Sequence, residues 1–152
     1  MKYEKMLDIA ETEYRMDVRE KPLLHNDGLI YGRRCAIRKD ISTAEKVGTL
    51  AEEIGHRQLS VGDITDYSDP NNWKQEVKAR TFGYQLAVTP EDLINAYEHG
   101  CQSCYEIASF LDVTEQYLTD AIERFRQIFG LYQRYGDFLI MFEPNLGIIK
   151  FQ

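Results

Sequence analysis

The run from Glu52 to His56, which reads Glu-Glu-Ile-Gly-His, has residue types and a spacing that could do chemistry. In the H-E-x-x-H motif, two His on one face of a helix bind zinc, and the Glu beside the first His acts as a general base. Here Glu52 and His56 have the ligand spacing and Glu53 has the base position. The first ligand is therefore a carboxylate, and the run alone is a weak signal because Glu-rich helices are common.

A purely structural explanation of the same segment is also open. The helix that carries it has an apolar stripe, and its charged residues lie roughly opposite that stripe. The stripe consists of Val47, Leu50, Ala51 and Ile54, and the other face of Glu45, Glu52 and His56. A charged face opposite an apolar stripe is usually just solvated.

A third carboxylate, Glu76, favours the metal centre over a solvated face. Glu76 shares a helix face with the small residues Ala79, Gly83 and Ala87, and the helix of Glu52 has its own row, Ala44, Gly48, Ala51 and Gly55. Because a Gly inside a helix costs about 1 kcal/mol relative to Ala, two such rows indicate helices packed backbone against backbone. Large apolar residues flank Glu76 on both sides, so we expect it to be buried, and a buried carboxylate needs a partner such as a metal ion.

These two segments together resemble the ImmA/IrrE family of metallo-endopeptidases. The family pattern is H-E-x-G-H followed by E-x-x-A-x-x-F-A, and this chain has Glu-Glu-Ile-Gly-His and then Glu-Val-Lys-Ala-Arg-Thr-Phe-Gly from Glu76. The stretches Leu86–Pro90 and Ile107–Thr114 resemble the family's following segments. The similarity spans roughly residues 28 to 130.

The resemblance implies a zincin-like hydrolase with Glu52, His56 and Glu76 as metal ligands and Glu53 as general base. It implies a zinc cofactor, although the oxygen-rich ligands also suit manganese. It further implies a protein substrate, typically a transcriptional repressor encoded beside the enzyme on a phage or mobile element. Glu52 stands where the family has its first His, so the ligands would leave a divalent ion with no net charge instead of +1, and water on it would be less acidic.

Two other functions stay open. The chain could keep the peptidase fold and bind a repressor without cleaving it, in which case Glu53 would be dispensable. A DNA-binding regulator fits less well, because the net charge is −7 and a phosphate-binding surface needs clustered cations. The helix pair 103–111 and 114–129 has helix-turn-helix proportions, but its second helix begins Thr-Glu-Gln-Tyr, so we expect a packing unit and no direct binding of nucleic acid.

The elements that must position these residues form an α+β fold, mostly helical. We expect one domain over 1–152, with a helical subdomain at about 90–130. Capping signals and periodicity predict helices over Met1 to about Val18, Ser42 to about Leu59, about Asn72 to Ala87, Pro90 to Glu98, Ser103 to about Leu111, and Thr114 to Phe129. Hairpins are expected over Gly28–Arg38 and at the end of the chain, where Phe138–Phe142 and Leu146–Phe151 flank a turn, and a loop over Gly62–Asn72.

The remaining Cys and His residues give no second site. Cys101 and Cys104 have metal or redox spacing but lack a second ligand pair, so we expect ordinary residues at a helix start, and Cys35 is expected in a strand. The roles of His25 and His99 stay open. An odd number of Cys, no signal-like segment and no membrane-length apolar run predict a cytoplasmic protein without a membrane span.

Overall fold

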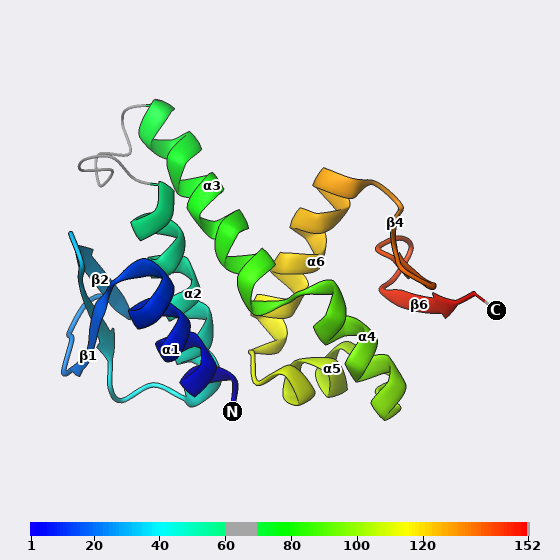
Figure 1. Ribbon diagram of the computed structural model, residues 1–152, viewed down its shortest axis with the longest axis horizontal. Coiled ribbons are helices and arrows are strands. Elements are labelled where there is room, and N and C mark those ends of the chain that lie inside the picture. The colour runs from blue at the N-terminus through cyan, green and yellow to red at the C-terminus, as the bar shows by residue number, and fades with distance from the viewer. Residues whose placement is uncertain (60–69, 152) are drawn as a thin grey trace. The chain divides into compact units, whose positions relative to one another are not determined.

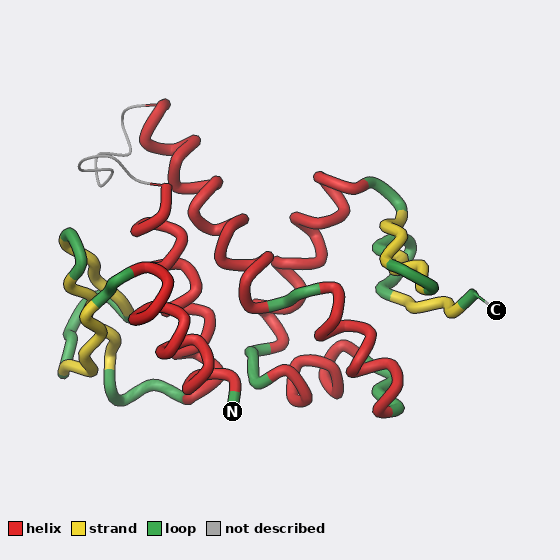
Figure 2. Tube along the Cα trace, viewed as in Figure 1, coloured by secondary structure: helices red, strands yellow, loops and turns green. Residues whose placement is uncertain are grey.

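The structure is a computed structural model that describes residues 1–59 and 70–151. The chain folds as two compact units, Met1–Ala87 and Val88–Gln152, which we call unit 1 and unit 2. Each unit combines helices with a small three-stranded sheet, so the predicted α+β, mostly helical class is confirmed (Figures 1 and 2). No helix in the described ranges has both the length and the apolar character needed to cross a membrane.

Unit 1 is built around one central helix. Its elements are α1 (Lys2–Tyr14), β1 (Asp17–Lys21), β2 (Gly28–Tyr31), β3 (Arg34–Arg38), α2 (Thr43–Leu59) and α3 (Pro70–Ala87). In the sheet, β3 lies in the middle, parallel to β1 and antiparallel to β2. Helix α2 contacts β2 and β3 and packs against both α1 and α3 (Figure 1). The candidate ligands on α2 therefore lie in the interior layer of the unit.

Local sequence explains why α2 forms where it does. Ser42 and Glu45 make reciprocal hydrogen bonds between side chain and backbone, the predicted capping box, which satisfies two free N–H groups at the helix start. The apolar stripe of Val47, Leu50 and Ile54 is completely buried. Burying side chains of this size stabilises the fold by about 1.5–3 kcal/mol each, so the stripe fixes the rotation of α2 about its axis.

Helices α2 and α3 pack with their backbones in contact, as the two rows of small residues predict. A Cβ atom added at Gly55 would lie 2.1 Å from the Ala79 carbonyl oxygen, and one at Gly83 would lie 2.9 Å from the Ala51 carbonyl. Larger residues at either glycine would separate the helices. The close approach brings α3 near enough for its carboxylate to meet residues of α2.

Unit 2 contains the predicted helix pair and a meander of three strands. Its elements are α4 (Pro90–His99), α5 (Cys104–Leu111), α6 (Glu115–Phe129), β4 (Tyr132–Tyr135), β5 (Phe138–Met141) and β6 (Gly147–Lys150). The three strands are antiparallel in the order β4-β5-β6. Side chains of Thr89, Ser103 and Thr114 cap the three helices. The core of the unit is apolar.

The structure corrects several element boundaries. Helix α1 ends at Tyr14 instead of about Val18, because Arg15 adopts a left-handed conformation (φ 55°) and the chain turns into β1. Strands β1 and β4 were not predicted, so both hairpins gain a third strand. Helix α3 begins at Pro70, a residue type suited to the first turn and two residues before the predicted start at about Asn72, so the end of the predicted loop is helical. The rest of the predicted 62–72 loop falls outside the described residues.

Candidate metal centre

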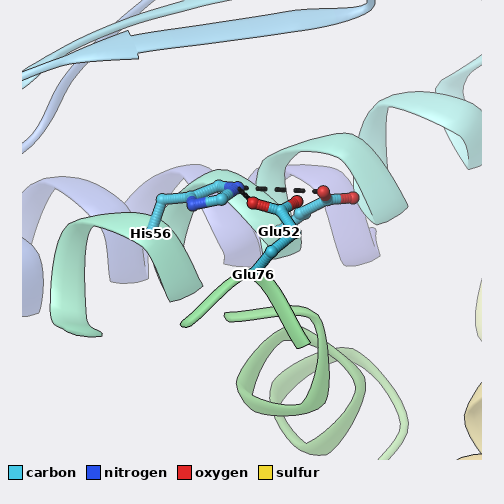
Figure 3. A group of neighbouring side chains, drawn as sticks. All are labelled: Glu52, His56 and Glu76. Atoms are coloured by element: carbon cyan, nitrogen blue, oxygen red, sulfur yellow. Dashed lines mark ion pairs between the residues drawn. The ribbon is translucent and has the colours of Figure 1, made fainter. Parts of the chain in front are cut away.

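Three of the predicted site residues come together between α2 and α3. Glu52 and His56 project from successive turns of α2, and Glu76 reaches them from α3 (Figure 3). One ligand atom from each lies within 4.8 Å of the other two. The side chains of Glu76 and His56 are only 3% and 12% exposed, whereas that of Glu52 is 36% exposed. The group is therefore buried on the α3 side and open beside Glu52.

The spacing of these atoms fits a zinc-sized ion. Two ligand atoms at about 2.1 Å from a tetrahedral ion lie about 3.4 Å apart. His56 Nε2 is 3.3 Å from Glu76 Oε2 and 3.8 Å from Glu52 Oε1. These two distances are close to the tetrahedral value, and all three ligand atoms lie within 4.8 Å of one another.

A buried ligand oxygen without a hydrogen-bond partner points to the same conclusion. Glu76 Oε2 is buried and makes no hydrogen bond; the same holds for two atoms outside the predicted ligand set, His56 Nδ1 and Glu53 Oε2. The contact of Glu76 Oε2 with His56 Nε2 is an ion pair whose geometry does not make a hydrogen bond. A buried carboxylate oxygen left without a partner costs free energy that a bound cation would offset.

In the metal-free site, the pKa values of the ligand side chains are shifted by burial and by neighbouring charges. Burial raises the pKa of Glu76, and hydrogen bonding with Glu52 raises it further. Burial alone would raise the pKa of Glu52, but its contacts with His56, Glu76 and Arg80 lower it overall. The pKa values of the two carboxyl groups are therefore shifted in opposite directions, up for Glu76 and down for Glu52. Burial alone would lower the pKa of His56, but the three surrounding carboxylates raise it. The negative charge of Glu52 also raises the pKa of Glu76, although burial contributes most.

Glu53 lies beside this group, on the side of α2 that faces β2. Its Cγ and Oε1 atoms lie close to the position that a Cβ on Gly28 would occupy. The residue is 8% exposed, and burial, aided by the charges of Glu52 and Glu76, raises its pKa to about 7. A carboxylate with a pKa near 7 can accept and release a proton near neutral pH.

Arg80 is a member of the cluster that sequence reasoning missed. Its Nε lies 3.5 Å from Glu52 Oε1 and 3.6 Å from Glu76 Oε1. The spacing of Glu76 and Arg80, one helical turn apart, is the signal that could have found it, because such pairs face each other on a helix. The contact with Glu52 crosses between helices and leaves no mark in the sequence.

The other candidate residues lie apart from this cluster. His25 is exposed in the bend between β1 and β2, and the His99 ring lies 4.7 Å from that of Phe110 in unit 2. The three cysteines are free thiols: Cys35 is buried in β3, and Cys104 begins α5, as predicted. In the described part of the chain, none of these five residues joins a group that could hold a metal ion.

Unit 1 also has a hollow of about 580 Å³ outside the ligand group. It lies between α1, β1 and the turn after β2, and its lining includes Arg15, Arg19 and Arg33 together with Glu11 and Asp17. Arg19 is paired with Asp17 at 3.2 Å. Because cationic and acidic side chains both line the hollow, its charge does not indicate which class of ligand it would bind.

Comparison of the chain with protein-family models, with curated proteins and with solved structures found no match in any of the three. The function is therefore inferred from the residues of unit 1 and their geometry.

Proposed function

We propose that this protein is a metal-dependent endopeptidase with a zincin-like centre, of the kind found in the ImmA/IrrE family. The observation that carries the proposal is the convergence of Glu52, His56 and Glu76, whose ligand atoms lie within 4.8 Å of one another, with a buried and unpartnered carboxylate oxygen on Glu76. Zinc is the ion that the resemblance implies and that a ligand set of one His and two carboxylates can hold, and manganese is the alternative that the two carboxylates allow.

The four residues would have two roles, metal binding and proton transfer. Glu52, His56 and Glu76 would hold the ion, which supplies Lewis acidity and lowers the pKa of water. Glu53, buried beside the ligand group, would accept a proton from the attacking water and return it to the leaving amine. The expected substrate is a regulatory protein such as a phage or mobile-element repressor, and the expected location is the cytoplasm.

One observation favours a second function, a repressor-binding protein without activity. Arg80 and His56 already form ion pairs with Glu52 and Glu76, so cations of the chain itself neutralise much of the cluster. A site compensated in this way can persist without metal. The protein would then act only by holding its partner.

Elemental analysis of the full chain, purified without a His-tag and without chelator, tests the metal centre. We expect about one equivalent of zinc or manganese, lost in both the His56→Ala and Glu76→Ala variants. Absence of metal even after incubation with zinc would reject the peptidase and leave the binding protein. A matched His99→Ala variant should bind metal like the wild type, since His99 lies in unit 2.

The Glu53→Gln variant then separates the two functions. In a peptidase this change should abolish cleavage of a candidate repressor while metal content and repressor binding persist. In a binding protein the change should leave function intact. Cleavage is read by gel electrophoresis and mass spectrometry of the products, and binding by pull-down of the same repressor.

A further inference from the structure

Arg80 lies at the open side of the cluster and contacts both of the ligand carboxylates, Glu52 and Glu76. Its Nε is 3.5 Å from Glu52 Oε1 and 3.6 Å from Glu76 Oε1. The guanidinium carbon also lies 5.9 Å from the centre of the Trp73 ring, on the same helix. The residue is thus held between two acidic ligands and an aromatic face, although 44% of its side chain is exposed.

The charges of the cluster explain what the guanidinium of Arg80 would add to a bound ion. A divalent ion bound by two carboxylates and a neutral imidazole has no net charge, and such an ion withdraws little electron density from water. A guanidinium beside both carboxylates brings the total to +1. Its contacts with Glu52 and Glu76 also draw electron density away from the oxygens that would bind the ion.

We propose, building on the proposed function, that Arg80 is a positioning residue that acts through Glu52 and Glu76 to keep the bound ion electron-poor enough to activate water. The ion and Arg80 carry like charges and share the same carboxylates. Arg80 therefore weakens metal binding while it strengthens the chemistry of the metal. A residue that only supported the structure would have the opposite effect on binding, because its loss would loosen the ligands.

The test uses the full chain loaded with Co²⁺, whose visible spectrum reports protonation at the ion. Three variants are compared with the wild type: Arg80→Gln removes the charge, Arg80→Lys keeps it, and Lys78→Gln removes an equivalent charge from an exposed position of the same helix. Dissociation constants come from competition with a chromophoric chelator, and the pH of the spectral transition comes from titration.

The expected result is a pair of opposite changes in Arg80→Gln. Its dissociation constant for Co²⁺ falls, by about tenfold, and its spectral transition moves up by about one pH unit, a tenfold change in the acidity of water. Arg80→Lys stays within about half a unit of the wild type, and Lys78→Gln matches the wild type in both measurements. Weaker binding of Co²⁺ by a folded Arg80→Gln, or an unchanged transition, overturns the proposal.

A second pair of variants tests whether Arg80 acts through Glu52. Glu52→His should lower the pH of the transition, and adding Arg80→Gln to it should have a smaller effect than in the wild type. An equal effect in both backgrounds overturns the proposed route. If the wild type takes up no Co²⁺ at all, the proposed function itself fails; if it does and Arg80→Gln behaves like it, only the role of Arg80 fails.

Discussion

The two units of this chain use helices in different ways. In unit 1, α2 and α3 meet through glycine and alanine with their backbones in contact, and they enclose carboxylates. In unit 2, α5 and α6 contact each other and bury Ala108, Leu111, Leu118 and Phe125, and each helix begins with a side-chain cap. Both buried acidic residues in the described chain, Glu53 and Glu76, belong to unit 1.

The buried residues of unit 2 stabilise the fold, whereas some of those in unit 1 reduce its stability. An apolar core and capped helices stabilise unit 2, and no charged residue is buried in its described part, 88–151. Unit 1 buries carboxylates that destabilise its metal-free form, and Gly lowers the helix propensity of both α2 and α3. Folds retain destabilising features of this kind mainly at functional sites, so the functional site of this chain is expected in unit 1. Four predictions test this contrast, from the largest expected effect to the smallest.

Gly55→Ala should cause the largest loss. The added Cβ would lie 2.1 Å from the Ala79 carbonyl oxygen, so the helices must separate, and we expect a destabilisation of about 3 kcal/mol or more. Urea unfolding followed by the fluorescence of Trp73, the single Trp of the chain, measures it. Gly147→Ala in unit 2 is the matched control, because its nearest atom is 4.0 Å away. Equal effects would remove the distinction between the units.

Glu53→Gln should stabilise the metal-free protein at high pH but not at low pH. Burial raises the pKa of Glu53 from 4.5 to about 7, so the folded state keeps a proton that the unfolded state loses between these values. Stability therefore falls as the pH rises from 4.5 to 7, by roughly 3 kcal/mol in total. Glutamine is neutral, so the gain should be full at pH 8 and vanish at pH 4. Glu98→Gln, at an exposed site of unit 2, should change neither value.

Zinc should stabilise unit 1 selectively. At a free concentration of 100 times the dissociation constant, a ligand adds about 2.7 kcal/mol to the stability of the state that binds it. We expect amide hydrogen exchange to slow in α2 and α3 on adding zinc and to recover with chelator, while α6 is unchanged. Equal protection of both units, or of neither, would contradict a metal centre confined to unit 1.

Removal of a helix cap should have the smallest effect and should be alike in both units. Ser42 and Thr114 each accept a hydrogen bond from a backbone N–H in the first turn, of α2 and α6 respectively. Replacing either with Ala should cost about 1 kcal/mol in thermal or urea unfolding. Thr119→Ala, inside α6, controls for the loss of a hydroxyl. A much larger loss at Ser42 would mean that its cap has a further role in the site.

The helices were predictable because their signals are local. The caps at Ser42, Thr89 and Thr114 mark helix starts from side chains a few residues apart. Strand β1, Asp-Val-Arg-Glu-Lys, lacks both alternation and β-branched enrichment, and it is a strand because β3 pairs with it. Strand β4, Tyr-Gln-Arg-Tyr followed by Gly136 and Asp137, did carry a hairpin signal, which the prediction overlooked.

In the candidate site, too, some contacts could be predicted from local sequence signals and others could not. The small residues of α2 and α3 predicted that Glu76 would approach Glu52 and His56, because close packing leaves a row of small side chains on each helix. The Arg80–Glu52 contact joins side chains on two different helices, and its length depends on the crossing of those helices, which periodicity does not give. The position of Glu53 against Gly28 depends likewise on the docking of the sheet.

The contact between Gly55 and Ala79 has a consequence for the choice of ion. Because the two backbones touch there, α3 cannot move closer to α2, which limits how near Glu76 can come to the two ligands on α2. The three residues supply few ligand atoms, so the site favours an ion of low coordination number. Ca²⁺ binds oxygen at about 2.3–2.6 Å and takes six to eight ligands. Zinc binds nitrogen and oxygen at about 2.0–2.2 Å and needs four. We therefore expect the site to reject calcium at millimolar concentrations and to fill with zinc at far lower ones.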